Sequence, residues 1–581
     1  MACEDFIILI PCHSLEDFPT DLGDLESASL LNAFGAAWHP QLIAAAKVIP
    51  RWHRADAPPE MVRGKLIVVP EASRSQIPED WPEQATADGA AIVFAGEDRP
   101  ELIQKLLAEV GGEQADLDSE LVADSIALGT CHLLSELLMR AMRQYSILDE
   151  GRLQREAVAA AAAILANDAE AARTRLRNCF DVLTESRERF YPTECYLVDL
   201  CLVVPEFADE KLVRMLHALK PTNLMLQTCD LEEIAREKPE ILREVKEAWE
   251  RNTASLIGGE FREAPTACRS LTHLLTEFEC GREVFRKYLG KNPEIWGRRK
   301  FGLLPQLPQL LKHFGYLGAL HLAMDDGLYP DEEFSKIRWS GAGGAYIDAM
   351  TRIPLAAESA SSYLRFPSRM SESMDHDQVA AILFARWPEV KAPWFEDLRR
   401  MQNYSASLGK WTTLEDFFSY TDSAGRLSSY DVGDYLSPEM LHAVARQEHL
   451  PIERHVLAAT AQRNLETARF CTQIESLIRR GEIDEIPFRN TELQLDRLYE
   501  ETEPAQLAEE HRESSSQNLA SLLLKQDDST PEGLLLINPL SFDRKTLVKF
   551  AESEEKNGSN LQGVVQVPGC GFLWVTENDF P

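Results

Sequence analysis

The stretch from Thr253 to Trp339 constrains the fold more than any other part of the chain, because two periodic patterns alternate in it. Three short apolar runs, Ala254–Ile257, Glu294–Trp296 and Leu317–Met324, flank two segments in which leucine recurs at helical spacing. A glycine follows each helical segment, as a left-handed cap requires. Strand–helix–strand order with short connections predicts parallel strands in an α/β sheet or barrel.

Charged side chains follow each apolar run of this stretch. In barrel folds the C-terminal ends of the strands carry the chemistry, so these groups are predicted to share one rim. They are Glu260, Arg262, Glu263, Arg298, Arg299, Asp325 and Asp326. Three successive strands that deliver charge to one rim predict a binding mouth. The alternative is that strand ends are solvated and are charged for that reason alone.

The order of these pieces resembles a known enzyme family. The segments GGEFREAP, EFECGREVF and IWGRRKFGLLPQLPQLLKHFGY are similar in order and spacing to the barrel of glycoside hydrolase family 38 α-mannosidases, and more distantly to family 57. The similarity covers roughly Tyr191 to Asp422, and FG-x-x-x-Q-L-P-Q-L-L-K-x-x-G-Y is its most specific part. It implies a central (β/α)7-8 barrel of glycoside hydrolase/deacetylase type that cleaves glycosidic bonds. It also implies a zinc site.

Asp199 lies inside a near-continuous apolar run, Cys195–Val204, which predicts a strand buried on both faces. A carboxylate there is costly unless it is paired, protonated or bound to a metal. The family places a His-x-Asp zinc strand here, but the residue two before Asp199 is Leu197. Asp199 is therefore either a catalytic-site carboxylate or a buried structural residue. Zinc is implied by the resemblance alone, and the sequence assigns no metal ligand and no other cofactor.

A rearranged carboxylate pair is the catalytic hypothesis that the residues allow. Glu263 or Glu260 takes the place of the family's nucleophile, and the next strand carries Arg298 and Arg299, which stay protonated and cannot act as acid or nucleophile. Glu263 and Asp325 would face each other across the mouth, one ionised beside an arginine and the other protonated. Glycoside cleavage requires this division of roles. The competing interpretation is a structural network of acids paired with arginines.

Other side chains of the mouth are predicted to bind the sugar. They are Glu260, Arg298, Arg299, Asp326 and Trp387. Arginine can bind an anionic group through two parallel hydrogen bonds. Trp387 follows an apolar run and lies on the predicted site side, where an aromatic ring suits sugar stacking and core packing equally.

Changes of pattern divide the 581 residues into five segments. An α/β block at 1–118 precedes a helical hairpin or spacer at 119–190, the barrel at 191–430, a helical bundle with a linker at 431–528, and a β module at 529–581. The last segment resembles the opening strands of the β-sandwich in the mannosidase family. Within the first block, Pro, Trp and Asp accumulate in Arg51–Glu60, which predicts a loop.

Composition narrows the classes of partner. The formal net charge of −34 argues against nucleic acid and anionic membranes, which need clustered cationic surface. The sequence shows neither a membrane span of about 20 apolar residues nor a secretory leader. Eleven scattered cysteines without a CxxC pair predict reduced thiols and a cytoplasmic protein. Two functions stay open, both with a carbohydrate partner: an α-mannosidase-like hydrolase, and a catalytically inactive carbohydrate-binding or scaffold relative.

Overall fold

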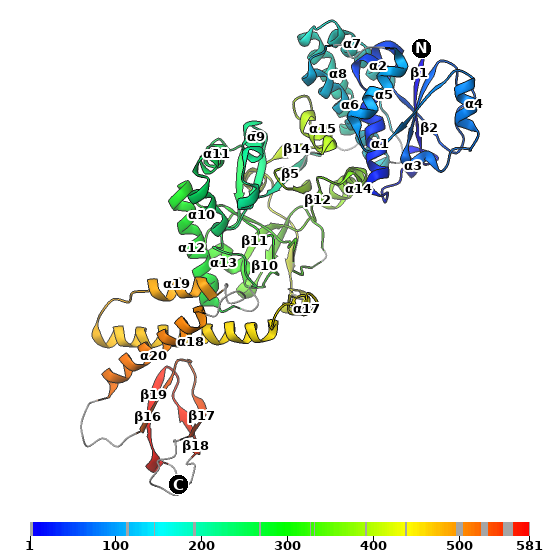
Figure 1. Cartoon of the computed structure of the whole chain (residues 1–581). Helices are drawn as coiled ribbons and strands as arrows, with labels where there is room; N and C mark the ends of the chain where they lie inside the picture. Colours follow the sequence, from blue (N-terminus) through cyan, green and yellow to red (C-terminus); the bar gives the residue numbers. More distant parts are fainter. Residues whose placement is uncertain are drawn as a thin grey trace. The chain divides into compact units, whose positions relative to one another are not determined.

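The computed structural model describes residues 4–111, 116–143, 146–189, 193–265, 269–325, 327–330, 332–389, 392–435, 439–495, 503–524, 533–549 and 562–579. Two compact units make up the chain, which runs from blue to red in Figure 1. The first unit contains residues 1–263 and 281–436, and the second contains residues 264–280 and 437–581. The finer division into five segments stays a prediction.

A four-stranded parallel sheet opens the first unit. Its strand order is β2–β1–β3–β4, with β1 at Asp5–Ile10, β2 at Arg51–Arg54, β3 at Lys65–Pro70 and β4 at Ala91–Ala95. β2 lies in a stretch predicted to be a loop. Its sequence, RWHR, has no apolar run, yet its backbone pairs with β1. Five helices accompany the sheet: α1 (Asp24–Ala36), α2 (Pro40–Ala46), α3 (Glu71–Arg74), α4 (Trp81–Ala87) and α5 (Arg99–Val110).

Three long helices follow, namely α6 (Ser119–Arg143), α7 (Glu150–Leu165) and α8 (Ala169–Glu188). Among the described residues, α6 is the one helix long and apolar enough to cross a membrane, over Ser119–Met142. Within its most apolar window, however, 83 % of the residues are buried inside the protein. α6 packs against α1, α8, α14 and α15, so its apolar surface is used by the core of the first unit.

An eleven-stranded sheet forms the rest of the first unit. Its order is β12–β13–β5–β6–β7–β8–β9–β11–β10–β15, with β14 paired to the first half of β5. β10 and β11 pair antiparallel, and the other described pairs are parallel. The strands are β5 (Cys195–Leu202), β6 (Thr222–Met225), β7 (Ala254–Ile257), β8 (Ile295–Trp296), β9 (Gly318–Leu320), β10 (Ile337–Ser340), β11 (Tyr346–Met350), β12 (Leu355–Ala356), β13 (Ala380–Arg386), β14 (Lys410–Thr412) and β15 (Leu427–Ser429).

Helices connect these strands, as the alternating pattern predicts. They are α9 (Glu210–His217), α10 (Thr228–Glu237), α11 (Pro239–Glu250), α12 (Leu271–Leu289), α13 (Leu307–His313), α14 (Ala360–His376), α15 (Pro393–Met401) and α16 (Leu414–Tyr420). Gly290 follows α12 with φ of 86°, and Gly315 follows α13 with φ of 76°. Both glycines therefore have the left-handed backbone expected at these caps.

The large sheet curls around one apolar interior. Seven strands contribute to a single buried cluster, with Val198, Leu200, Met225, Ile257, Ile295, Leu320, Met350 and Leu383 among its members. The pairing between described strands nevertheless ends at β12 on one side and β15 on the other. Near the start of β13, the Ser335 and Ser373 hydroxyls each accept the Ala381 N–H at 3.0 Å, where a paired strand would otherwise supply a carbonyl. An α/β fold with a largely parallel sheet is confirmed, and a closed barrel is not.

The second unit combines helices with two small sheets. Its helices are α17 (Glu439–Ala445), α18 (Pro451–Arg479), α19 (Ile486–Gln494) and α20 (Glu503–Leu523). The strands are β16 (Gly533–Asn538), β17 (Arg544–Lys549), β18 (Gln562–Val567) and β19 (Gly571–Thr576), paired antiparallel as β16–β19 and β17–β18. Residues 264–280 belong to this unit because the Thr276 hydroxyl donates to Glu492 at 2.9 Å and Gln462 donates to Ser270.

Candidate functional site at the strand ends

The turn after β7 depends on two glycines. Gly258 and Gly259 have φ of 151° and 145°. A Cβ on Gly258 would lie 2.6 Å from the Leu226 carbonyl oxygen, and one on Gly259 would lie 1.7 Å from the Tyr316 hydroxyl. Only glycine fits this close approach. The turn then leads to Glu263, on the rim at the C-terminal ends of the parallel strands.

Glu263 ties the end of β7 to the end of β8. One carboxylate oxygen accepts the backbone N–H of Arg299 and the other accepts that of Lys300, both at 2.9 Å. The Glu263 N–H in turn donates to the Gln227 side-chain carbonyl at 3.0 Å, which joins the end of β6 to the same arrangement. The structure thus places Glu263 at the predicted mouth and fixes its side chain through bonds to both oxygens.

Glu260 and Arg298 lie beneath this rim. Their side chains are 4 % and 0 % exposed, and Glu260 Oε2 lies 4.0 Å from Arg298 Nε. Arg298 also donates to the Gly302 carbonyl at 3.2 Å. Burial raises the pKa of the Glu260 carboxyl, against the opposing charge of Arg298. The two predicted sugar-binding residues therefore face each other in the interior, as the alternative interpretation of a structural network expects.

Arg299, Asp325 and Trp387 meet at the rim from the ends of β8, β9 and β13. Arg299 Nε lies 3.5 Å from Asp325 Oδ2, and the Arg299 guanidinium lies 5.6 Å from the centroid of the Trp387 ring. Phe207 packs edge-on against the half-buried Trp387 at 5.2 Å. The structure therefore brings these three residues close together at the strand ends. Asp326 lies outside the described residues.

Asp230 is a carboxyl group of this rim that the sequence did not indicate. It stands in the first turn of α10, directly after β6, and accepts hydrogen bonds from Gln227 at 3.3 Å and from the Cys229 thiol at 3.7 Å. Burial and the negative charge of Glu263 raise the pKa of Asp230 to about 6, against the opposing effects of the Cys229 thiol and of Arg299. Its position just after a strand could have indicated a site residue. The charged helical pattern around it, however, is typical of a solvated surface.

Asp199 lies in the middle of β5 and has a structural environment. Arg386 donates to both of its oxygens at 2.7 and 2.8 Å, Arg399 donates at 2.8 Å, and the Thr222 hydroxyl donates at 2.9 Å. Burial alone would raise its pKa, yet the two guanidinium groups outweigh burial and lower it. Its neighbours Val198 and Leu200 face the interior of the curled sheet, so Asp199 faces the opposite side. These contacts favour the structural interpretation over a catalytic role.

The strand where the resemblance implies zinc does not fit that ion. Leu197 has no ligand atom, and two arginines already hold the Asp199 carboxylate. Across the ranges that the structure describes, no group of three or more His, Cys, Asp or Glu side chains is close enough to hold a metal.

No family model matches the sequence, and no curated protein matches it either. Similar solved structures include an α-mannosidase from Enterococcus faecalis V583, with 13 % sequence identity and a TM-score of 0.44. The match covers 62 % of this chain and 46 % of the mannosidase chain. A 4-α-glucanotransferase from Thermococcus litoralis has 15 % identity and a TM-score of 0.37, and the match covers 59 % of this chain and 61 % of the glucanotransferase chain. The α-amylase AmyC from Thermotoga maritima has 10 % identity and a TM-score of 0.31, and the match covers 91 % of this chain and 95 % of the amylase chain.

All three are carbohydrate-active enzymes. The chain spans about half the length of the mannosidase and about three fifths of the glucanotransferase. With TM-scores below 0.5 and identities of 15 % or less, these likenesses carry no argument about the activity of this chain.

Three acidic side chains on one rim therefore have unlike surroundings. Asp230 is half-buried with a raised pKa, Glu263 is bound to two backbone N–H groups, and Asp325 is exposed beside Arg299. Neighbouring carboxyl groups whose environments differ in this way can divide the roles of proton donor and proton acceptor.

Proposed function

We propose that this protein cleaves glycosidic bonds at the rim formed by the ends of β6 to β9 and β13. The observation that carries the proposal is the half-buried Asp230 carboxyl, which stands just after β6 and accepts hydrogen bonds from Gln227 and Cys229. Its pKa is raised to about 6 near a second carboxylate, Glu263. A general acid works best when its pKa lies near the working pH, because it then holds a proton and can still release it. Glycosidases raise the pKa of their acid residue in the same physical way.

The reaction divides among the residues of the rim. Asp230 donates its proton to the glycosidic oxygen as the bond between that oxygen and the anomeric carbon breaks. Asp325, the exposed carboxylate, accepts a proton from the water that attacks the anomeric carbon, while Arg299 orients Asp325 through the 3.5 Å ion pair. Glu263 acts through Asp230, because its negative charge favours the protonated form of that carboxyl.

Trp387 supplies the apolar surface that a sugar requires. Its ring is half-buried, with Phe207 at one edge and the Arg299 guanidinium 5.6 Å from its centroid. A pyranose presents axial C–H groups that pack on such a ring, while its hydroxyls reach the acids and the arginine around it. The resemblance of the sequence to α-mannosidases makes α-mannosides the first substrates to examine.

The test is hydrolysis of a panel of nitrophenyl α- and β-glycosides by the full chain, with and without zinc. Asp230→Asn should lower kcat by about 100-fold or more, the usual contribution of a general acid. Glu237→Gln is the matched control, since Glu237 is exposed near the end of the same helix, α10. Wild-type turnover should fall as pH rises above about 6, because Asp230 then loses the proton that it must donate. Turnover that survives in Asp230→Asn would refute the assignment.

Carbohydrate binding without cleavage is the second candidate. The pairing of Glu260 with Arg298 and of Asp325 with Arg299, together with the two hydrogen bonds on Glu263, favours it, because acids held in this way are less available to substrate. Saturable sugar binding that is lost in Trp387→Ala, with no turnover of any glycoside, would support this candidate over the hydrolase.

A further inference from the structure

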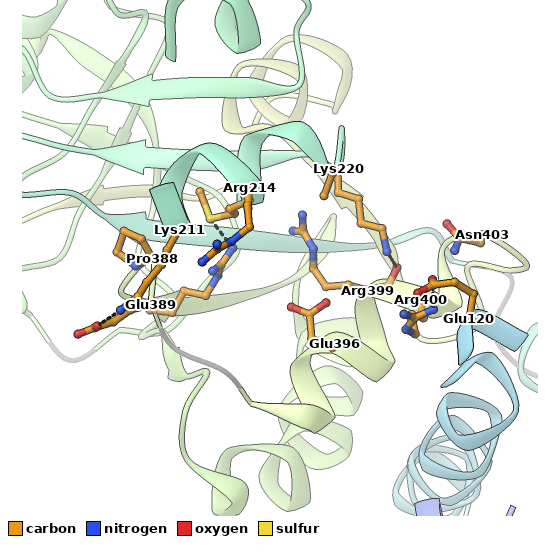
Figure 2. Close-up of a pocket in the computed structure, with 13 residues that line it drawn as sticks. Glu120, Lys211, Arg214, Lys220, Pro388, Glu389, Glu396, Arg399, Arg400 and Asn403 are labelled. Carbon is orange, nitrogen blue, oxygen red and sulfur yellow. Dashed lines mark hydrogen bonds and ion pairs between the residues drawn. The ribbon is translucent and has the colours of Figure 1, made fainter. Parts of the chain in front are cut away.

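A basic cavity lies on the outer side of the large sheet, between α9 and α15. Its volume is about 540 Å³. Figure 2 shows side chains around it that come from α6, from α9, from the segment before β6, from the end of β13 and from α15. Six of the lining side chains are cationic, namely Lys211, Arg214, Lys220, Arg386, Arg399 and Arg400. Three are acidic: Glu120, Glu389 and Glu396.

The positive charge of this cavity exceeds its negative charge. Asp124 and Asp199 do not line the cavity but pair with cations that do. With these two included, five acids stand against six cations. The whole chain has a formal net charge of −34. A local excess of positive charge therefore runs against the composition of the protein. A concave surface with a net positive charge attracts anions.

Most of the cations have acidic partners, but two do not. Arg386 and Arg399 share Asp199, Lys211 pairs with Glu389 at 2.6 Å, and Arg400 pairs with Glu120 and Asp124 at 3.0 Å. Within the described part of the chain, Arg214 and Lys220 have no ion pair. The Lys220 ammonium donates one hydrogen bond, to the Arg399 carbonyl at 2.7 Å, and its other two N–H groups remain for a ligand.

The surroundings of Lys220 show that its charge is poorly compensated. Burial, together with the charges of Arg399 and Arg400, lowers the pKa of Lys220 to about 8, against the opposing charges of Glu396 and Asp124. Burial and the charge of Arg386 also lower the pKa of Arg399. An anion in the cavity would relieve both effects, because a neighbouring negative charge favours the charged form of each cation.

We propose that this cavity binds a small phosphomonoester, such as a sugar phosphate, with Lys220 and Arg214 as its principal ligands. The volume lies within the range of roughly 300–1,000 Å³ found for small-molecule sites. A phosphomonoester dianion can accept hydrogen bonds from several cations at once, whereas a carboxylate has a single charge and two oxygens. The cavity has room for the organic part of the ester beside Pro388 and Met215.

This site is separate from the proposed catalytic rim. Arg386 and Trp387 are adjacent in sequence, yet Arg386 lines the cavity while Trp387 packs with the interior cluster and the rim. The proposal does not depend on glycoside cleavage. Asp230→Asn should leave phosphate binding unchanged, so failure of one proposal can be distinguished from failure of the other.

The experiment is isothermal titration calorimetry on the full chain with glucose 6-phosphate, inorganic phosphate, glucose and glucuronate. We expect saturable binding of glucose 6-phosphate and none of glucose. Lys220→Gln and Arg214→Gln should each weaken this binding by about tenfold, the usual loss for one hydrogen bond to a charged group. Lys105→Gln is the control, because Lys105 is an exposed lysine of α5 paired with Glu101, outside the cavity. The affinity should also decrease as pH rises through about 8, as Lys220 loses its proton.

Each arm of the titration has a defined meaning. Inorganic phosphate that binds as tightly as glucose 6-phosphate would support a phosphate site and identify the free anion as the ligand. Glucuronate that binds as tightly would overturn the proposal, since a carboxylate would then suffice. Binding that is unchanged in both Lys220→Gln and Arg214→Gln, or weakened equally in Lys105→Gln, would overturn it as well. The exposed position of Arg214 keeps this test valid if Lys220→Gln fails to fold.

Discussion

Asp199 lies in β5 of the large sheet and Asp230 lies in α10, the helix after β6, and their pKa values are displaced in opposite directions. Asp230 is only half-buried, but burial and Glu263 raise its pKa. Asp199 is fully buried, yet two arginines lower its pKa. Burial alone does not determine the protonation of a carboxyl group, because the charges within hydrogen-bond distance outweigh it.

At the scale of this residue, Asp230→Asn should stabilise the folded protein at neutral pH. The folded pKa of about 6 lies above the ordinary value of 3.8, so the folded state binds the extra proton and the free energy of unfolding falls as pH rises between these values. Asparagine removes this loss and should add roughly 1 kcal/mol at pH 7, allowing for partial exposure of the carboxyl. Urea denaturation at pH 7 and below pH 4 measures the difference. A variant no more stable than wild type at pH 7 would contradict the raised pKa.

The sequence could pose the question about Asp199 but could not answer it. An aspartate inside an apolar strand must have a partner, and this much follows from the residues alone. Its partners, Arg386 and Arg399, are 187 and 200 residues away, and no local pattern brings them to β5. Asp230 was missed because its neighbours in sequence are charged, a pattern that predicts an exposed helix and not a half-buried carboxyl group.

At the scale of elements, the Asp199 carboxylate joins β5 to β13, β6 and α15. Removing its charge with Asp199→Asn leaves two buried guanidinium groups without a counter-charge and should destabilise the protein by about 3–5 kcal/mol. The folded pKa lies below 3.8, so this contribution is present above about pH 4 and is lost as pH falls through the folded value.

Thermal unfolding at pH 7 measures this effect. Asp56→Asn serves as the control, because Asp56 forms an exposed ion pair with Arg54 and its loss should change stability little. Equal stability of the two variants would show that the Asp199 network contributes no more than a surface pair.

Local patterns predicted the elements better than their assembly. Apolar runs and leucine spacing located β7, α12, β8, α13 and β9 to within a few residues, because each element buries one periodic face. β2 was missed because its short sequence, RWHR, contains no apolar run, although its backbone pairs with β1. Whether the large sheet closes depends on contacts such as those of Ser335 and Ser373 with Ala381, which no periodicity encodes.

At the scale of the whole molecule, the second unit is discontinuous in sequence. Residues 264–280 lie within the first unit's stretch of chain but pack with residues 437–581, through Thr276–Glu492 and Gln462–Ser270. A chain that ends at residue 436 would leave 264–280 without these partners.

We therefore expect a chain ending at residue 436 to unfold at a lower temperature than the full chain and to aggregate more readily, since the buried Thr276 and Cys280 would lose their contacts with Glu492 and Arg489. Differential scanning calorimetry with light scattering on both chains tests this expectation. An unchanged melting temperature for residues 1–436 would show that 264–280 needs no support from the second unit.

The contacts of Glu263 also bear on how sequences of this kind can diverge. Among the described residues, its carboxylate accepts hydrogen bonds from the backbone N–H groups of Arg299 and Lys300, so this attachment to the neighbouring strand end does not depend on which side chains stand there. Every amino acid except proline supplies such an N–H. Positions 299 and 300 can therefore exchange one side chain for another over many generations while the rim keeps its shape. Related proteins can then have the same rim structure with different amino acids at these positions.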